Sequence, residues 1–317
     1  MKTLHAIASL LLALAAGTAF AAWPEKPIKV YIGYAAGGST DVVARLLAPR
    51  LGEKLGQPVV IENKPGAAGD FAAELMLQAP PDGYTLMMST VALHAINPGL
   101  FRQKFDPIGD FSMIAMVCSY PMIMIGSPQT SFKTIAELKA LAEKTPTFYS
   151  SYGVGSPGHL AGELLVKATG ARLTHVPYKG GSPSVLAILS GEAQVNFATL
   201  PAVVPQVRAG KVRAIGLASA ERNPAVPDVP TMAELGLADF EVGTWSALIG
   251  PKGMPADVVR RINAAVEETL DDPQVKKVLL DQGAEIRKMT PAETGSFVRA
   301  ENARWVKVVK DAGITPQ

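Results

Sequence analysis

Short apolar stretches alternate along most of the chain with longer segments whose apolar residues recur at helical spacing. The strand-like stretches are 28–34, 58–63, 83–89, 147–151, 173–176, 194–198 and 212–218, and helical patterns follow most of them. Strands separated by helices indicate βαβ units and parallel-rich sheets. The last third is mostly helical, and its final helix is expected to start at Thr290 with Glu293 in the capping-box position. The pattern predicts an α/β fold.

The most apolar stretch outside the N-terminus is 113–125, which contains Pro121. Its pattern predicts buried strands. At the N-terminus, Lys2 precedes the apolar run 6–16, and Ala19-Phe20-Ala21 gives a small-x-small cleavage pattern. This arrangement is typical of a signal peptide, and the apolar run is too short to span a bilayer. The sequence therefore predicts an exported protein that is cleaved after Ala21.

The length of 317 residues indicates two domains. The chain has 30 basic and 28 acidic residues, and one of the basic ones lies in the signal peptide. This near-neutral balance gives no electrostatic case for nucleic acid or an anionic membrane surface. Cys118 is the only cysteine, so it has no intrachain disulfide partner and reads as a buried side chain. The exported chain keeps three histidines without metal-ligand spacing, and we expect neither a metal nor a cofactor.

Two glycine-rich turns, 35–41 and 152–157, each follow a predicted strand and open a predicted helix. The sequence GVGSPG at 153–158 matches the dinucleotide fingerprint, but the segment about 20 residues later lacks its carboxylate. Neither turn carries a Walker-type lysine. A hydrolase would use Ser39 or Ser156 as nucleophile, yet no nucleophile-elbow or S-x-x-K motif is present, and each serine sits where a helix N-cap is needed.

Anion capture by backbone amides explains both turns more simply. The first N–H groups of a helix lack partners and carry partial positive charge, so they bind carboxylates or phosphates without a cation. If the two turns lie in facing domains, their helix N-termini converge on one small anion. The enzyme interpretations remain as alternatives.

Motifs over essentially the whole exported chain resemble a known family. They are WPEKPIKV, AAGGSTD, LGQPVVIENKPGAAG, PDGYTL, INPGLF, YGVGSPGHLAGELL, HVPYKGGSP, GKVRAIGLAS, VPDVPTMAELG, GTWSALIGPKGMP and ENARWVKVVKDAGI. Together they are similar to the Bug-type extracytoplasmic solute receptors of tripartite tricarboxylate transporters. The chain departs from many relatives at GYAAGG, where they have a Phe-Ala-Pro-Gly-Gly form.

The resemblance implies a type II periplasmic-binding-protein fold, with two βαβ domains joined by two crossing segments and a ligand cleft between them. Residues 1–21 would be the signal peptide, 22–124 and 243–317 the first domain, and 125–242 the second. The implied function is capture of a small carboxylate-bearing organic acid in the periplasm and its delivery to integral membrane permease subunits. We expect a monomer that is not an enzyme and does not bind nucleic acid. A ligand sensor for signalling is the alternative within the same fold.

The resemblance also implies site residues. The carboxylate would be bound, partly through ordered water, by two groups of turn residues: Gly37, Gly38, Ser39 and Thr40, and Ser151, Gly153, Val154, Gly155 and Ser156. Selectivity is expected from side chains further into the cleft: Tyr34, Ala36, Thr90, His94, Tyr152, Tyr178, Lys179, Phe197 and Thr199. Among these, Lys179 would either neutralise a second carboxylate or lie in an exposed loop.

The cleavage pattern generates the first testable prediction. Protein recovered from the periplasm should have an intact mass that corresponds to a chain beginning at Ala22. Recovery of the uncleaved chain from the periplasm would contradict the export argument.

Overall fold

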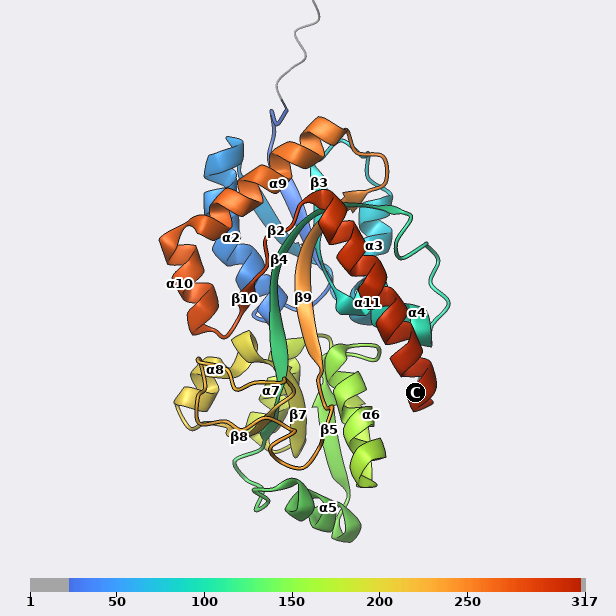
Figure 1. Ribbon diagram of the computed structural model, residues 1–317, viewed down its shortest axis with the longest axis vertical. Helices are drawn as coiled ribbons and strands as arrows, with labels where there is room; N and C mark the ends of the chain where they lie inside the picture. Colours follow the sequence, from blue (N-terminus) through green and yellow to red (C-terminus); the bar gives the residue numbers. More distant parts are fainter. Residues whose placement is uncertain (1–22, 315–317) are drawn as a thin grey trace, which may run out of the picture.

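A computed structural model describes residues 23–314, whose strands form a ten-stranded mixed sheet (Figure 1). The main path of the sheet runs β2-β1-β3-β9-β4-β7-β5-β6, while β8 and β10 pair with β4. The predicted signal peptide and the start at Ala22 lie outside the described residues. Within residues 23–314, no helix combines the length and the apolar character needed to cross a membrane.

The first lobe is built by the N-terminal elements together with the C-terminal ones. The N-terminal elements are β1 (Ile28–Ile32), α2 (Ser39–Leu55), β2 (Val59–Asn63), η1 (Ala67–Gly69), α3 (Asp70–Leu77), β3 (Thr85–Thr90), η2 (Ala92–Ile96) and α4 (Asn97–Leu100). The C-terminal elements are β9 (Gly243–Pro251), α9 (Ala256–Asp271), α10 (Pro273–Asp281), β10 (Glu285–Ile286) and α11 (Pro291–Ala312). The parallel pairs β1–β2 and β1–β3 confirm the βαβ pattern predicted here.

The second lobe contains the middle of the chain. Its elements are α5 (Ile135–Lys144), β5 (Thr147–Ser151), α6 (Pro157–Thr169), β6 (Leu173–Pro177), α7 (Gly181–Ser190), β7 (Val195–Thr199), α8 (Leu200–Arg208) and β8 (Arg213–Leu217). Strand β5 pairs in parallel with β6 and β7, as expected for βαβ units. Each of these strands is followed by a helix that packs back against the sheet, so the helix N-termini gather at one edge of the lobe.

One strand passes through both lobes. The run 113–125, interpreted from the sequence as buried strands, is part of the single strand β4 (Phe111–Gly126). Strand β4 pairs with β9 as far as Pro121, and from Met122 onward it pairs with β7 and then β8. Pro121 is tolerated inside the strand because it lies where β4 changes partners. The predicted domain bounds at 124/125 and 242/243 fall inside β4 and just before β9, and we retain them as a proposal.

The helices begin in two ways: some have a side-chain N-cap, and others begin at a glycine turn without one. Thr290 and Glu293 form the predicted capping box of α11, and Ser156 caps α6 by accepting a hydrogen bond from the His159 N–H. The predicted cap at Ser39 is wrong, because the N-cap of α2 is Gly38 and no side chain caps this helix. Likewise α7 begins at Gly181 without a side-chain cap. These uncapped ends leave backbone N–H groups for another partner.

Buried histidines pack in the core of each lobe. The His94 ring stacks on Trp245, 5.9 Å between centroids, and burial lowers its pKa to about 4. In the second lobe, His159 stacks on His175, 4.3 Å between centroids. Burial lowers both pKa values, and that of His175 falls to about 3 with a smaller contribution from His159. All three rings are therefore neutral in the folded protein near pH 7.

These pKa values predict acid destabilisation. An unfolded histidine titrates near pH 6.5, so below that pH the unfolded chain binds protons that folded His94 does not, and the free energy of unfolding falls. For His94 the loss by pH 5 is about 2 kcal/mol. Burial raises the pKa of Asp70 to about 6, so Asp70 partly offsets this loss by binding a proton first in the folded state. Urea unfolding from pH 7 to pH 5 should show a shallower decline for His94→Gln than for the unsubstituted protein, and equal slopes would contradict the assignment.

Candidate functional site

Two chambers lie between the lobes, and Tyr34 and Tyr152 line both of them. The inner chamber has a volume of about 20 Å³, enough for about one water molecule. The outer chamber has a volume of about 400 Å³, within the usual range for small-ligand sites. The two tyrosine rings meet edge to face with 5.7 Å between centroids, and so form the wall between the chambers.

Three helix N-termini from both lobes meet at the inner chamber. The N-cap residues of α2 and α8, Gly38 and Thr199, line it, as does Gly181 at the first position of α7. None of the three helices has a side-chain cap. Because the first N–H groups of a helix have no partner within that helix, these ends bring donors and partial positive charge to one small space. Such an arrangement suits an anion.

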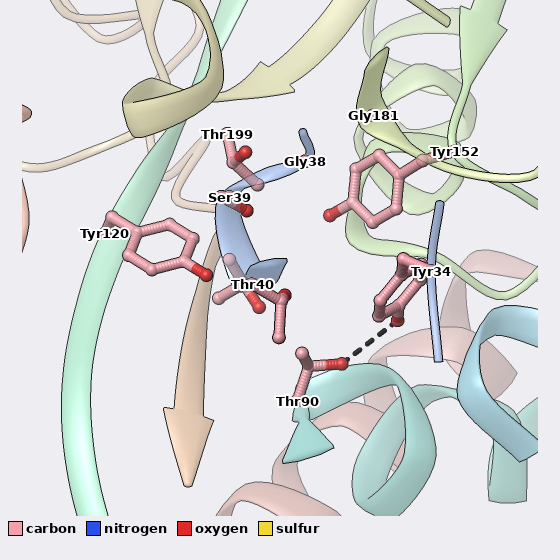
Figure 2. A pocket seen from close by; sticks show the side chains of 10 residues that line it. Tyr34, Gly38, Ser39, Thr40, Thr90, Tyr120, Tyr152, Gly181 and Thr199 are labelled. Atoms are coloured by element: carbon pink, nitrogen blue, oxygen red, sulfur yellow. Dashed lines mark hydrogen bonds between the residues drawn. The ribbon is translucent and has the colours of Figure 1, made fainter. Parts of the chain in front are cut away.

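Hydroxyl groups complete the inner chamber. Figure 2 shows the side chains of Tyr34, Tyr120 and Tyr152 around the same space as the threonines and Ser39. The Tyr34 hydroxyl lies 3.1 Å from Thr90 Oγ1 and donates to the Ala68 carbonyl at 2.9 Å. Burial raises the pKa of Tyr34 and Tyr152 well above the ordinary value, and that of Tyr120 to about 12. The phenols therefore stay protonated, and the lining contains no cation.

The loops that bring these helices together touch across the lobes. The Ala35 N–H donates to the Lys179 carbonyl at 3.1 Å. Gly180 has φ +148°, and a Cβ on it would lie 2.8 Å from the Ala35 nitrogen. A Cβ on Gly38 would lie 3.7 Å from the Gly181 nitrogen, an ordinary contact distance. The close approach therefore requires glycine at 180, whereas the space at 38 admits alanine.

Asp41 braces the first of these loops. Its carboxylate accepts hydrogen bonds from the Gly37 N–H at 2.9 Å, from Arg45 Nε at 3.0 Å and from Asn63 Nδ2 at 2.9 Å. Burial alone would raise the pKa of Asp41, but the hydrogen bonds from Arg45, Gly37 and Asn63 outweigh it and hold the pKa below its ordinary value. Asp41 thus stays ionised and fixes the turn that leads into α2.

The second glycine turn uses several of its polar groups in hydrogen bonds of its own, and its predicted role in anion binding stays a prediction. The Gly155 N–H donates to His159 Nδ1 at 3.3 Å, and the Ser156 N–H donates to the Gly153 carbonyl at 3.1 Å. The Ser151 hydroxyl lies 2.7 Å from His175 Nε2. Ser151, Gly155 and Ser156 line neither chamber, whereas Gly153 and Val154 of the same turn line the outer one.

Other predicted residues divide between the chambers. Seven line the inner one: Tyr34, Gly38, Ser39, Thr40, Thr90, Tyr152 and Thr199. Tyr34 and Tyr152 also line the outer one, which adds Gly153, Val154, Tyr178 and Lys179. Ala36 and Gly37 are exposed and line neither chamber, so their predicted role in binding stays a prediction. His94 and Phe197 are buried in the core away from both.

Sequence reasoning missed Tyr120, Gly181 and Thr244, which line the inner chamber. Gly181 had a signal, since it begins a Gly-Ser-Pro segment at 181–183 after a predicted strand, the same three residues that occur at 155–157. Tyr120 and Thr244 lie inside β4 and β9. Nothing in the local pattern of these two strands distinguishes them from core positions.

The outer chamber is larger and carries charge. Its first-lobe lining comes from the segment before α3, from α3 itself and from the segment after α4, and includes Asp70, Glu74, Arg102 and Lys104. Its second-lobe lining comes from the loops after β5 and β6, including Lys179. Arg102 and Lys179 are exposed, whereas Asp70 is buried.

The chain is similar over nearly its whole length to known solute receptors. The family profile described as "Tripartite tricarboxylate transporter family receptor" matches residues 43–314. Protein BugT of Bordetella pertussis is 33% identical over 295 residues, which cover 92% of this chain and 90% of BugT.

Solved structures show the same architecture. The periplasmic binding protein BugD aligns with a TM-score of 0.89 and 32% identity, covering 93% of this chain and 100% of that one. Rpa4515 of R. palustris, solved with adipate, aligns with a TM-score of 0.89 and 34% identity over the same shares of the two chains. These likenesses confirm the predicted α/β fold of the periplasmic-binding-protein type.

The lobe contact at Gly155 generates a prediction. A Cβ at this position would lie 2.2 Å from Asn97 Oδ1, on the other lobe, and Gly155 has φ +80°. Gly155→Val should hold the lobes apart, which small-angle scattering would report as a larger radius of gyration. Gly210→Val is the matched control, because Gly210 has φ +65° and no atom within 4 Å of the added Cβ. An equal radius for both variants would show that this contact does not set the lobe separation.

Proposed function

This chain belongs to the tripartite tricarboxylate transporter receptor family, and on that premise we propose that it captures a small carboxylate-bearing acid between its lobes. The observation that carries the proposal is the meeting of three uncapped helix N-termini at the inner chamber. Buried N–H groups without partners are costly, and a bound anion or an ordered water supplies those partners. A carboxylate fits better than a cationic or apolar group because helix N-termini bring N–H donors to this space and none of the described residues that line it is acidic.

In the proposed complex, the acid occupies the outer chamber and directs one carboxylate to the wall formed by Tyr34 and Tyr152. The inner chamber of about 20 Å³ is too small for the whole acid but accommodates a water molecule. Such a water would accept from the helix ends and donate to the carboxylate. The Tyr34 and Tyr152 hydroxyls stay neutral because burial raises the pKa of both, so they add no negative charge beside the carboxylate.

The dimensions and charge of the outer chamber support a short organic acid. Its volume of about 400 Å³ suits a ligand of a few carbons. The relative Rpa4515 was solved with adipate, a dicarboxylate. Lys179 and Arg102 line the chamber from opposite lobes, so both attract an acid into it. Because both side chains are exposed, we assign them a modest share of the affinity.

Binding by both lobes provides the link to transport. Gly38 and Thr90 contribute to the inner chamber from the first lobe, and Gly181 and Thr199 from the second. A ligand that contacts both lobes favours their closed arrangement by its difference in affinity for the two arrangements. We propose that the closed receptor, exported to the periplasm and monomeric, delivers the acid to the permease subunits of a tripartite transporter.

The carboxylate requirement is directly testable. A thermal-shift screen of mono-, di- and tricarboxylates of three to six carbons should yield a ligand, because one present at 100 times its dissociation constant stabilises the fold by about 2.7 kcal/mol. Calorimetry should then show at least tens-fold weaker binding for the fully esterified or amidated form of that ligand. The expected loss follows from hydrogen bonds to a charged group, about 1.5–3 kcal/mol each. Equal affinity for the acid and its ester would overturn the proposed site chemistry.

A further inference from the structure

The outer chamber contains a buried carboxylate that carboxylate capture does not explain. Asp70, the first residue of α3, has only 9% of its surface exposed and lines the chamber. An acid at this position adds negative charge to a chamber proposed to receive an anion. It therefore calls for a separate partner.

One carboxylate oxygen of Asp70 accepts two hydrogen bonds from the described residues, and the other accepts none. Its Oδ1 accepts hydrogen bonds from Asn97 Nδ2 at 2.6 Å and from Gln103 Nε2 at 3.1 Å. Gln103 Nε2 also donates to the Leu93 carbonyl at 3.0 Å, so this donor is itself fixed. Among residues 23–314, no group donates to Oδ2 of Asp70. The carboxylate is thus oriented by neutral amides while half of its accepting capacity is unused.

No cation of the described chain neutralises Asp70. Lys104 is paired with Glu74 at 3.1 Å, and no ion pair of the described residues includes Asp70. Burial, with a smaller contribution from Glu74, raises the pKa of this carboxyl to about 6, against the hydrogen bonds from Asn97 and Gln103. The Asp70 carboxyl group is therefore ionised at pH 7.5, but no cation of the described residues neutralises its negative charge. A hydrogen bond from an incoming donor is strongest to such a carboxylate.

We propose that Asp70 is a specificity-determining residue that accepts a hydrogen bond from an ammonium or hydroxyl group carried by the captured acid. This inference rests on the proposed function, because it places the acid in the outer chamber. The preferred ligands are then amino or hydroxy acids rather than plain dicarboxylates. A ligand without the donor leaves a buried acceptor unpaired, and polar sites reject such analogues strongly.

Three acids of equal chain length separate this idea from general carboxylate binding. Succinate, L-malate and L-aspartate share two carboxylates and differ at one carbon, which bears hydrogen, hydroxyl or ammonium. Calorimetry at pH 7.5 should show malate, aspartate or both binding the unsubstituted protein at least tenfold more tightly than succinate, a difference of about 1.4 kcal/mol.

Two substitutions in the same chamber test the residue. In Asp70→Asn the amide oxygen can keep the bonds from Asn97 and Gln103, while an NH₂ group replaces the free oxygen. The preference over succinate should fall to within threefold. Glu74→Gln is the matched control, since it removes a negative charge from the same lining but from a group already paired with Lys104, and it should keep the preference. Thermal melting of each variant checks that it is folded.

The outcomes distinguish the two proposals. Equal binding of all three acids by the unsubstituted protein would overturn the role of Asp70 and leave carboxylate capture standing. An equal loss of preference in Glu74→Gln would also overturn it, because total chamber charge would then explain the effect. If none of the three binds at 10 mM while the wider acid screen finds a plain dicarboxylate, the inference fails alone. If no carboxylate of the wider screen binds, the proposed function fails with it.

Discussion

The site depends on the contact between two backbone loops, one from each lobe, at Gly38 and Gly181. Where these loops meet, the Ala35 N–H donates to the Lys179 carbonyl, and Gly180 leaves room for Ala35. The contact sets the N-termini of α2 and α7 beside each other with their first N–H groups uncapped. Buried donors without partners destabilise a fold unless something accepts from them. The uncapped N–H groups of α2 and α7 therefore lie together at one place. An anion or an ordered water that accepts hydrogen bonds from them would stabilise the fold.

The shared strand β4 explains how the two loops can meet reproducibly. Because β4 belongs to the sheet of both lobes, the lobes are not free to rotate about a flexible linker. Further contacts cross between them away from the chambers. Lys167 of α6 donates to the Asp311 carbonyl of α11 at 2.9 Å, and Asn223 donates to the Gly283 carbonyl at 3.1 Å. Figure 1 shows α11 extending from the first lobe toward α6. Any change in the separation of the lobes must break or bend these hydrogen bonds, so they stabilise the observed lobe arrangement.

The two chambers divide recognition into a general and a selective part. In the proposed complex the inner chamber contributes the N–H groups of helix N-termini, which suit a carboxylate whatever carries it. The outer chamber is lined by Asp70 and Glu74 of α3 and by loop side chains such as Lys179, and loop positions vary readily among relatives. This division accounts for how one architecture can serve receptors for different acids. Asp70 lines only the outer chamber, so under the proposed function it lies apart from the helix N-termini of the inner one.

The sequence by itself determined the alternation of strands and helices, the capped ends at Ser156 and Thr290, and the family. Each of these follows from residues close together in the chain, through periodicity, capping chemistry or motif. It did not determine which helix ends share the site. In the sequence, the glycine turn before α6 resembles the one before α2. In the structure, N–H groups of the α6 turn donate to His159 and Gly153, whereas the turn before α7 has no side-chain cap. Tyr120 and Thr244 reach the chamber only because β4 and β9 lie side by side. Tertiary structure decided these points, since hydrogen-bond competition within a turn and packing between distant strands have no local sequence signature.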